Sequence, residues 1–305
     1  MPSYVKKIIA AIFLFVFIIG LVVYQDQLIR VSQQLILAHD QNSFNEPNEY
    51  QITYEFKYIR NTNNFEPKNH QDLLNIYYTF INSGSTSFSF FCPREYRNCI
   101  EDVGEISRNA ELLSHLNNFV HPFNSFEYIT TSFNNMNKVT VELKHNYTTE
   151  MINKINVEVA RLEQQLIRDD MTNEQKIRVI HDYIIENSKY DVGRANKTDF
   201  SHQSNLAYGP LFEGFAICSG YSDAMAIFLN RWNIPNFRAA SANHIWNVVY
   251  INNEWLHLDL TWNNPVLPDG SQIIDHTFFL ITTARLKEID TDEHNFPTDI
   301  YIEAS

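Results

Sequence analysis

The sequence predicts an α+β protein with one N-terminal transmembrane helix, a small α+β module, and a C-terminal domain in which a cysteine-bearing helix packs on an antiparallel sheet. Three observations lead to this prediction. An apolar stretch near the N-terminus has membrane-spanning length, the middle of the chain changes repeatedly between strand and helix periodicity, and a helical pattern that starts at a cysteine precedes a hairpin pattern. The hydrophobic content of 44% is typical of a folded chain with a sizeable core.

The first 25 residues determine the expected compartment. Lys6 and Lys7 precede an unbroken apolar stretch from Ile8 to Tyr24. Such a stretch is near the lower limit for crossing ~30 Å of hydrocarbon, and the paired lysines are expected to stay in the cytoplasm. We expect an uncleaved signal anchor at 1–25, because the end of the stretch lacks a small-x-small cleavage pattern. The alternative is a signal peptide that is cleaved, followed by secretion. Either reading exports the rest of the chain.

The charge balance narrows the expected partners. The net charge is −13, and basic residues do not form the clusters that neutralise phosphates. We therefore expect no nucleic-acid partner, and a membrane partner only through the N-terminal helix.

A linker and a small module are expected before the C-terminal domain. Residues 26–48 are expected to form a stalk and a polar linker, and residues 49–147 an α+β module of unknown role. The module's patterns are, in chain order, a strand at QITYEFKYI, a helix at DLLNIYYTFIN, a strand at SFSFF, a helix at EISRNAELLSHLNNF, and a strand pair at FEYITTSF and KVTVELKH.

Three cysteines need an explanation in an exported chain. Cys92 and Cys99 lie close together in the sequence, and a disulfide and two unpaired buried thiols are equally compatible with their spacing. Cys218 is then the odd cysteine, which makes it a candidate reactive thiol.

Helical patterns lead into the C-terminal domain, which we expect at 148–305. Thr172 followed by Gln175 predicts a capped helix start, and apolar residues recur after it at helical spacing. His181 lies inside this helix, where we expect a structural role.

Cys218 is expected at the start of a buried helix. The apolar residues that recur at helical spacing after it are Tyr221, Ala224, Met225, Phe228, Leu229 and Trp232. A thiol at a helix N-terminus lies beside unpaired N–H groups and the positive end of the helix dipole, which favours the thiolate. The same N–H groups could hold a developing oxyanion. Gly214 and Gly220 bracket the turn and would permit close backbone approach.

The segment HIWNVVYINNEWLHLDLTW predicts a hairpin that places a base and an acid together. A two-residue turn at Asn252-Asn253 pairs Ile251 with Glu254 and makes His244 and Asp259 diagonal neighbours on one face. The expected core face carries Ile245, Val249, Ile251, Leu256, Leu258, Leu260 and Trp262. Cys218 as nucleophile, His244 as base and Asp259 as orienting acid would form a complete catalytic set.

At these residues the sequence resembles the transglutaminase-like superfamily, which is related to papain-like cysteine proteases. Cys218 in GFAICSGY, His244 in NHIWNVV and Asp259 in WLHLDLTWNNP carry the resemblance, in matching order and spacing. Bacterial exported proteins of this superfamily also have a helix like KIRVIHDYIIENSKYD and a region like AYGPLFEG before the cysteine. The resemblance covers about residues 172–296. Two departures are the isoleucine of HIW, where alanine is common, and Ser219, where glutamine is frequent.

The resemblance implies a papain-like core and a cysteine enzyme that forms a thioester acyl-enzyme from an amide. With water as acceptor it would be a peptidase or amidase, and with an amine it would crosslink proteins. A protein or peptide substrate at the cell surface or cell wall is implied, and we expect no cofactor. The alternative is a non-catalytic surface module that uses the same fold for binding or as a scaffold.

Further candidates for the cleft or for a second oxyanion donor are Tyr208, Gln203, His257 and Trp246. We expect no metal site, because His202, His257, His276 and His294 form no recognisable ligand motif.

Overall fold

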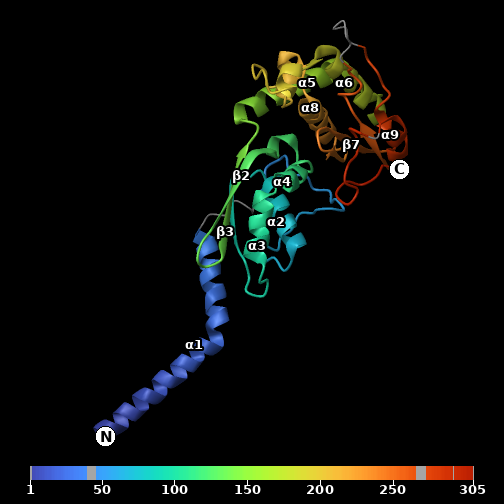
Figure 1. Cartoon of the computed structure of the whole chain (residues 1–305). Coiled ribbons are helices and arrows are strands. Elements are labelled where there is room, and N and C mark those ends of the chain that lie inside the picture. Colours follow the sequence, from blue (N-terminus) through green and yellow to red (C-terminus); the bar gives the residue numbers. More distant parts are fainter. Residues whose placement is uncertain (1, 40–45, 266–272, 291, 305) are drawn as a thin grey trace.

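The computed structural model describes residues 2–39, 46–265, 273–290 and 292–304. It is a mixed α+β structure with a three-stranded and a four-stranded antiparallel sheet, as predicted, and a long helix extends from the globular part at the N-terminal end (Figure 1). A parallel pair of two-residue strands completes the described sheets.

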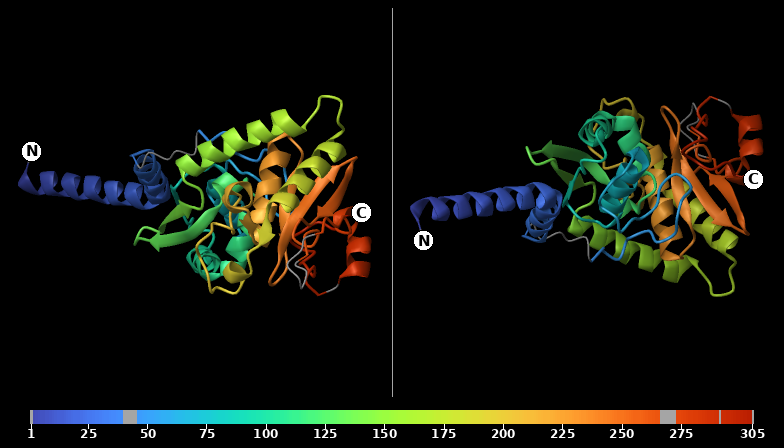
Figure 2. Two further views of the ribbon diagram at one scale, coloured as in Figure 1. Left: turned by 90° about the horizontal axis from the view of Figure 1, so that it is seen from above. Right: turned by 90° about the horizontal axis from the view of Figure 1, so that it is seen from below.

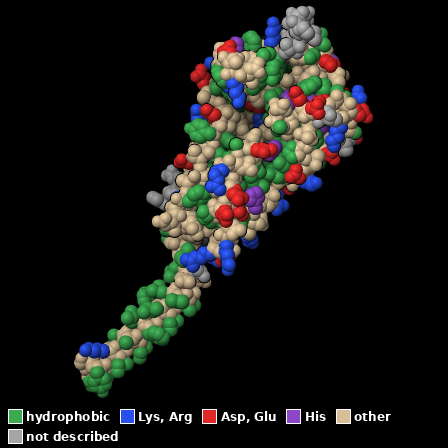
Figure 3. Space-filling model, viewed as in Figure 1, with side chains coloured by type: hydrophobic (Ala, Val, Ile, Leu, Met, Phe, Trp, Pro, Cys, Tyr) green, Lys and Arg blue, Asp and Glu red, His purple; other side chains and the backbone are tan. Residues whose placement is uncertain are grey.

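The N-terminal helix α1 (Ser3–His39) contains the predicted membrane segment. Its stretch Ser3–Gln25 is 23 residues long, and none of it is buried in the globular part. Figure 3 shows the hydrophobic side chains along this helix. By length and composition the stretch could cross a membrane. A signal sequence has the same properties, so the anchor and the cleaved peptide both stay predictions.

The first lobe, residues 46–147, packs helices on one sheet. Its antiparallel sheet has the order β1-β3-β2. The elements are α2 (His70–Asn82), β1 (Ser87–Phe91), α3 (Cys99–Arg108), α4 (Ala110–Asn117), the short helix η2 (Pro122–Asn124), β2 (Phe126–Phe133) and β3 (Lys138–His145). The single helix expected after residue 104 is divided, because Asn109 accepts a hydrogen bond from the backbone of Leu112 and starts α4 anew.

The strand predicted at residues 51–59 is wrong. The segment is irregular because side chains of α2 satisfy its backbone in place of a neighbouring strand. Asn82 accepts from the N–H of Ile52 at 2.9 Å and donates to its carbonyl at 2.8 Å. Asn75 accepts from the N–H of Arg60 at 3.1 Å.

The second lobe, residues 148–304, places helices against a sheet of the order β6-β7-β8-β9. The capping box predicted at Thr172 and Gln175 is confirmed. The elements are α5 (Thr149–Leu166), α6 (Asn173–Asn187), β4 (Lys189–Tyr190), α7 (Val192–Ala195), η3 (Gly209–Glu213), β5 (Phe215–Ala216), α8 (Cys218–Arg231), β6 (Asn236–Ala240), β7 (Ile245–Ile251), β8 (Glu254–Leu258), β9 (Phe279–Ile281) and α9 (Thr283–Ile289).

The predicted hairpin register is confirmed. Ile251 pairs with Glu254 and Asn247 with Leu258. Asn252 and Asn253 have φ angles of 53° and 68°, as the turn of a two-residue hairpin loop requires.

The expectation that one face of this hairpin is the core face and the other is polar is wrong. Val249 and Leu258 pack against α8 and α6 on one face, but Trp246 and Val248 are equally buried on the other. Figure 2 shows helices on one side of the orange sheet and the red C-terminal segment on the other. Alternating polar and apolar residues separate the two faces of a strand. They do not show that a later segment of the chain will pack on the more polar face and bury it.

The two lobes share a hydrophobic cluster. Phe237 on β6 stacks on Phe119 of the first lobe, with ring centroids 5.4 Å apart, and on Tyr301 near the C-terminus. Buried Arg238 forms an ion pair with Asp223 on α8, and its guanidinium also donates to carbonyls of the first lobe. The predicted domain boundaries stay predictions, but the parts that they separate are packed together in one cluster.

Candidate functional site

Cys218 is the first residue of α8, as predicted. The thiol is partly buried and is not part of a disulfide. The segment before the helix packs tightly on its first turn. The N–H of Ile217 donates to the carbonyl of Ser204 at 2.8 Å, and the Ser219 hydroxyl donates to the carbonyl of Asn205 at 2.9 Å. A Cβ at Gly220 would lie 2.2 Å from the Ser204 carbonyl oxygen, so only glycine fits there.

His244 and Asp259 form a buried pair beside this thiol. His244 precedes β7, Asp259 follows β8, and His244 Nε2 lies 2.6 Å from Asp259 Oδ2. Cys218 is also among the groups that raise the pKa of this imidazole, and Nδ1 is the ring nitrogen that the Asp259 contact does not use. The structure thus brings the three predicted residues together.

The electrostatics of the pair favour charges on both members. Burial lowers the pKa of His244, but the Asp259 carboxylate and Cys218 outweigh it and raise that pKa to about 10. Burial raises the pKa of Asp259, yet the charge and hydrogen bond of His244 and the hydrogen bond from His294 bring it well below its ordinary value. An imidazolium beside a carboxylate is the partner that a thiolate nucleophile requires.

Asp259 is held through both carboxylate oxygens. Oδ1 accepts from the N–H groups of Thr261 and Trp262, at 2.8 and 3.2 Å. Oδ2 accepts from His244 and also from His294 Nε2, at 2.9 Å. The carboxylate therefore cannot turn away from His244 without losing several hydrogen bonds.

His294 is a site residue that the sequence did not reveal. The sequence offers it only as one of several histidines without a metal-ligand motif, and its contact with Asp259 joins positions 35 residues apart. The spacing of Asp290 and His294 is a local signal for a carboxylate–imidazole pair, and their atoms lie 2.6 Å apart. Nothing in the sequence points from that pair to Asp259.

Trp246 and His257 pack behind His244. The indole of Trp246 stacks on the His244 ring at 5.6 Å and donates to His257 Nδ1 at 2.9 Å. His257 Nε2 faces the Thr283 hydroxyl at 2.9 Å, and burial lowers the pKa of His257 to about 3. The ring is therefore neutral, with both nitrogens used within the protein. His257 positions Trp246 and does not line the cleft.

Gln203 precedes and Tyr208 follows the segment 204–206 that packs on the start of α8, and Tyr208 is the N-cap of η3. Gln203 is exposed, and its N–H donates to Glu213 at 2.6 Å. Tyr208 is half-buried against Phe212, with ring centroids 4.7 Å apart. Neither side chain has a described hydrogen bond to the cysteine, the histidine or the aspartate, so their roles as oxyanion donors stay predictions.

Tyr190 is a second residue that the sequence did not reveal. It pairs with Ala216 across β4 and β5, two residues before Cys218. Burial, followed by the charge of Cys218, raises the pKa of Tyr190 to about 12, so its hydroxyl keeps its proton near the thiol. Parallel pairing of two-residue strands carries no periodic signal that a sequence could show.

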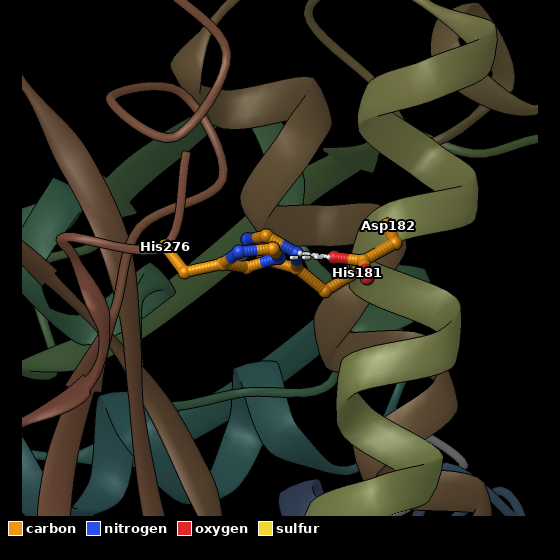
Figure 4. Close-up of side chains that lie close together, drawn as sticks. All are labelled: His181, Asp182 and His276. Carbon is orange, nitrogen blue, oxygen red and sulfur yellow. Dashed lines mark hydrogen bonds and ion pairs between the residues drawn. The ribbon is translucent and has the colours of Figure 1, made fainter. Parts of the chain in front are cut away.

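A separate polar cluster joins α6 to the segment before β9 (Figure 4). Asp182 Oδ1 lies 2.8 Å from His181 Nδ1 and 2.7 Å from His276 Nε2, an arrangement that could hold a metal ion. Asn263 determines which ring nitrogen of His181 carries the proton. Its Oδ1 accepts from the N–H of Phe278, so its Nδ2 must donate to His181 Nε2. The proton of His181 is then on Nδ1 and donates to Asp182. His181, Asp182, His276 and Asn263 are thus joined by hydrogen bonds, and a structural role for His181 stays a prediction.

The remaining cysteines lie in the first lobe. Cys92 and Cys99 form a disulfide with a Cα–Cα distance of 5.7 Å, the first of the two alternatives.

A comparison with known protein families matches the part of the chain that contains the site. Residues 160–260 match the family model of the transglutaminase-like superfamily. That stretch runs from within α5 to just past β8 and contains the cysteine, the histidine and the aspartate. This part of the chain is therefore transglutaminase-like. No curated protein sequence matches the chain.

Two solved structures show distant likeness. One is a TGase, 17% identical, with a TM-score of 0.32, covering 45% of this chain and 44% of that one. The other is a candidate cysteine protease from Cytophaga hutchinsonii, 13% identical, with a TM-score of 0.28, covering 51% of this chain and 69% of that one. The chain thus spans less than half of the TGase's length. No statement about activity follows from likenesses this distant.

Proposed function

We propose that this protein is an exported, membrane-anchored cysteine enzyme that acts on amide bonds through a thioester acyl-enzyme. One observation carries the proposal. Cys218 begins a buried helix and is among the groups that raise the pKa of His244, and His244 Nε2 lies 2.6 Å from Oδ2 of buried Asp259. Nucleophile, base and orienting acid are thereby neighbours in the order that acyl transfer needs.

The first half-reaction forms the thioester. The Cys218 thiolate attacks the amide carbonyl carbon, and the developing oxyanion is held by N–H groups of the first turn of α8. When the carbon–nitrogen bond breaks, the His244 imidazolium donates its proton to the departing amine. The acyl group remains on sulfur, and His244 is left neutral beside Asp259.

The second half-reaction returns the enzyme to its starting state. Neutral His244 takes a proton from the acceptor as the acceptor attacks the thioester carbonyl, and the thiolate departs. Water as acceptor gives a carboxylic acid, which is hydrolysis. A primary amine gives a new amide, which is crosslinking. The transglutaminase-like match supports a protein or peptide as the acyl donor.

Two features support action outside the cytoplasm. The paired lysines before α1's apolar stretch favour an orientation with the lobes outside, and the Cys92–Cys99 disulfide suits an oxidising compartment. We propose attachment through Ser3–Gln25, with the lobes facing the cell surface or cell wall.

A product assay tests the proposal. The full chain in detergent micelles is incubated with glutamine-containing peptides and a biotinylated primary amine, and the peptides are analysed by mass spectrometry. We expect amine incorporation, conversion of glutamine to glutamate, or peptide cleavage, and at least a 1,000-fold lower rate in Cys218→Ala, as an order-of-magnitude expectation. Equal product from the variant contradicts the proposal. Absence of product, together with equal binding of wall fragments by both forms, favours the non-catalytic alternative.

A further inference from the structure

The end of the lobes from which α1 extends carries a disulfide-bonded loop and the turn of a hairpin. The loop is residues 92–99, and the turn, residues 133–138, joins β2 to β3. The N–H of Cys92 donates to the carbonyl of Asn137 at 2.9 Å, so the loop and the turn are held side by side. We call these two segments together the basal surface. Figure 1 shows this end of the lobes beside α1 and the second lobe at the opposite end.

The helix α1 places the basal surface close to the proposed membrane. Arg30 follows the stretch Ser3–Gln25 by five residues in the same helix, and its Nη2 lies 3.5 Å from Glu95 Oε1 in the loop. α1 also lies beside β1, which ends just before the loop. Five helical residues rise about 8 Å, and a headgroup layer is about 5–8 Å thick on each side of the hydrocarbon. When Ser3–Gln25 crosses a membrane, the basal surface therefore lies at the outer edge of the headgroups.

The basal surface carries side chains that suit a membrane–water interface. Arg94 and Arg97 are exposed on the loop, and Phe133 and Met136 are 45% and 54% exposed on the turn. Of the four charged residues in these two segments three are basic, although the whole chain has a net charge of −13. Figure 3 shows Lys and Arg side chains where α1 meets the lobes. Basic side chains attract anionic headgroups, and aromatic and apolar side chains enter the headgroup layer.

A hollow of about 270 Å³ lies between the loop and the turn, and Arg94, Tyr96, Arg97 and Asn137 are among the residues that line it. The disulfide closes the loop, and the Tyr96 hydroxyl donates to Asp102 on α3, so the two arginines project from an ordered backbone. A guanidinium group binds phosphate oxygens through parallel N–H donors. The hollow therefore offers a place for the phosphate of a lipid headgroup.

We propose that the basal surface binds the phosphate headgroups of the membrane that α1 crosses. The two arginines of the loop contact the phosphates, and Phe133 and Met136 lie within the headgroup layer. These contacts, in addition to α1, fix the lobes against the membrane and hold the second lobe, which carries Cys218, away from the lipid (Figure 1). The inference rests on the proposed attachment through Ser3–Gln25 and does not depend on catalysis.

Fluorescence quenching tests the contact. The four natural tryptophans all lie in the second lobe and provide the background. Phe133→Trp adds a tryptophan at the turn. Tyr128→Trp is the matched control, because Tyr128 is 52% exposed on the same strand, about 17 Å further from the turn. Each full-length variant is placed in vesicles of phosphatidylcholine and phosphatidylglycerol, with and without a lipid that carries a nitroxide on its headgroup.

The nitroxide lipid should lower the added fluorescence of Phe133→Trp by roughly twofold or more and leave that of Tyr128→Trp nearly unchanged, because the headgroup layer is only about 5–8 Å thick. Equal quenching of the two variants overturns the proposal. So does an unquenched Phe133→Trp in a chain that floats with the vesicles, which would leave the basal surface to a protein or a wall polymer. A chain that does not float with the vesicles contradicts the attachment itself, and the inference with it.

Charge variants test the role of the arginines. Arg94→Gln with Arg97→Gln is combined with Phe133→Trp, and the control pair is Arg168→Gln with Arg285→Gln, two exposed arginines of the second lobe. We expect the first pair to reduce the quenching at position 133 by about half or more and the control pair to leave it unchanged. Equal losses in the two pairs, or no loss in the first, overturn the proposed phosphate contacts. Neither experiment needs a substrate, so a failed product assay would leave both results interpretable.

Discussion

Asp259 is the residue on which the polar contacts of the site converge. Its two oxygens accept from two imidazoles and two backbone N–H groups, and no part of its carboxylate is left for solvent. Sequence alternation was enough to place it beside His244, because a two-residue turn fixes the register of a hairpin. Its second imidazole partner could not be predicted, since the contact arises from the tertiary path of the C-terminal segment.

The charges on His244 and Asp259 predict a pH dependence of stability. The pKa of His244 rises from 6.5 to about 10 on folding, so its contribution is fully present below pH 6.5 and is lost as the pH rises toward 10. The pKa of Asp259 is lowered from 3.8, so its contribution is present above pH 4 and is lost as the pH falls further.

Urea unfolding of the wild type and of Asp259→Asn checks this dependence. The difference in unfolding free energy between the two should shrink by about 2 kcal/mol from pH 6 to pH 9. A constant difference over that interval would show that the imidazolium–carboxylate pair does not form in the folded protein.

At the scale of elements, the start of α8 depends on close contact with the segment at residues 204–206. Helical spacing predicted where this helix begins, and the structure agrees. The tight packing was visible in the sequence only as Gly220 beside the cysteine. At the segment 51–59 the sequence pattern predicted the wrong structure. Its residues alternate as in a strand, but amide side chains of α2 bind its backbone where a neighbouring strand would.

Gly220→Ala tests the packing at the start of α8. Its new Cβ would meet the backbone of Ser204 at 2.2 Å and of Leu206 at 3.1 Å, so the helix start must shift. We expect a loss of about 1–3 kcal/mol in unfolding free energy and slower alkylation of Cys218.

Gly104→Ala on α3 is the matched control. Its Cβ would meet the far end of the flexible Arg108 side chain at 3.2 Å, and alanine is the better helix former, so stability should be unchanged or slightly higher. Equal losses in the two variants would contradict the role assigned to the close approach.

At the scale of the whole molecule, the C-terminal sheet is covered on both faces. α8 and α6 cover one face, and Figure 2 shows the C-terminal segment on the other side of the sheet. Residues of the first lobe join the hydrophobic cluster that includes Phe237, Trp246 and Val248. The part of the chain predicted as a small module thus packs against the sheet that follows it in the sequence. Periodicity cannot reveal such packing between distant segments, because it reports which side of an element is buried and not against what.

Arg238→Gln tests the connection between the lobes. Arg238 is buried, pairs with Asp223, and donates to the carbonyls of Asn117 and Val120. Its removal leaves a buried carboxylate without its cation, so we expect a loss of about 3–5 kcal/mol in urea unfolding.

The half-exposed pair of Arg231 and Glu163 is the control, because an exposed ion pair contributes about 1 kcal/mol or less. A loss in Arg238→Gln no larger than that in Arg231→Gln would mean that the lobes do not depend on the buried pair.

The central claim is that Cys218 carries an acyl group during turnover, and intact-protein mass spectrometry tests it most directly. The full chain is mixed with an excess of glutamine-containing or wall-derived peptide, quenched in acid within milliseconds to seconds, and digested to locate any adduct. We predict an acyl adduct on Cys218 that hydroxylamine removes, as it removes a thioester, and no adduct at that position in Cys218→Ala. An unmodified Cys218 during observed turnover, or the same adduct yield on another residue in the variant, would contradict the account.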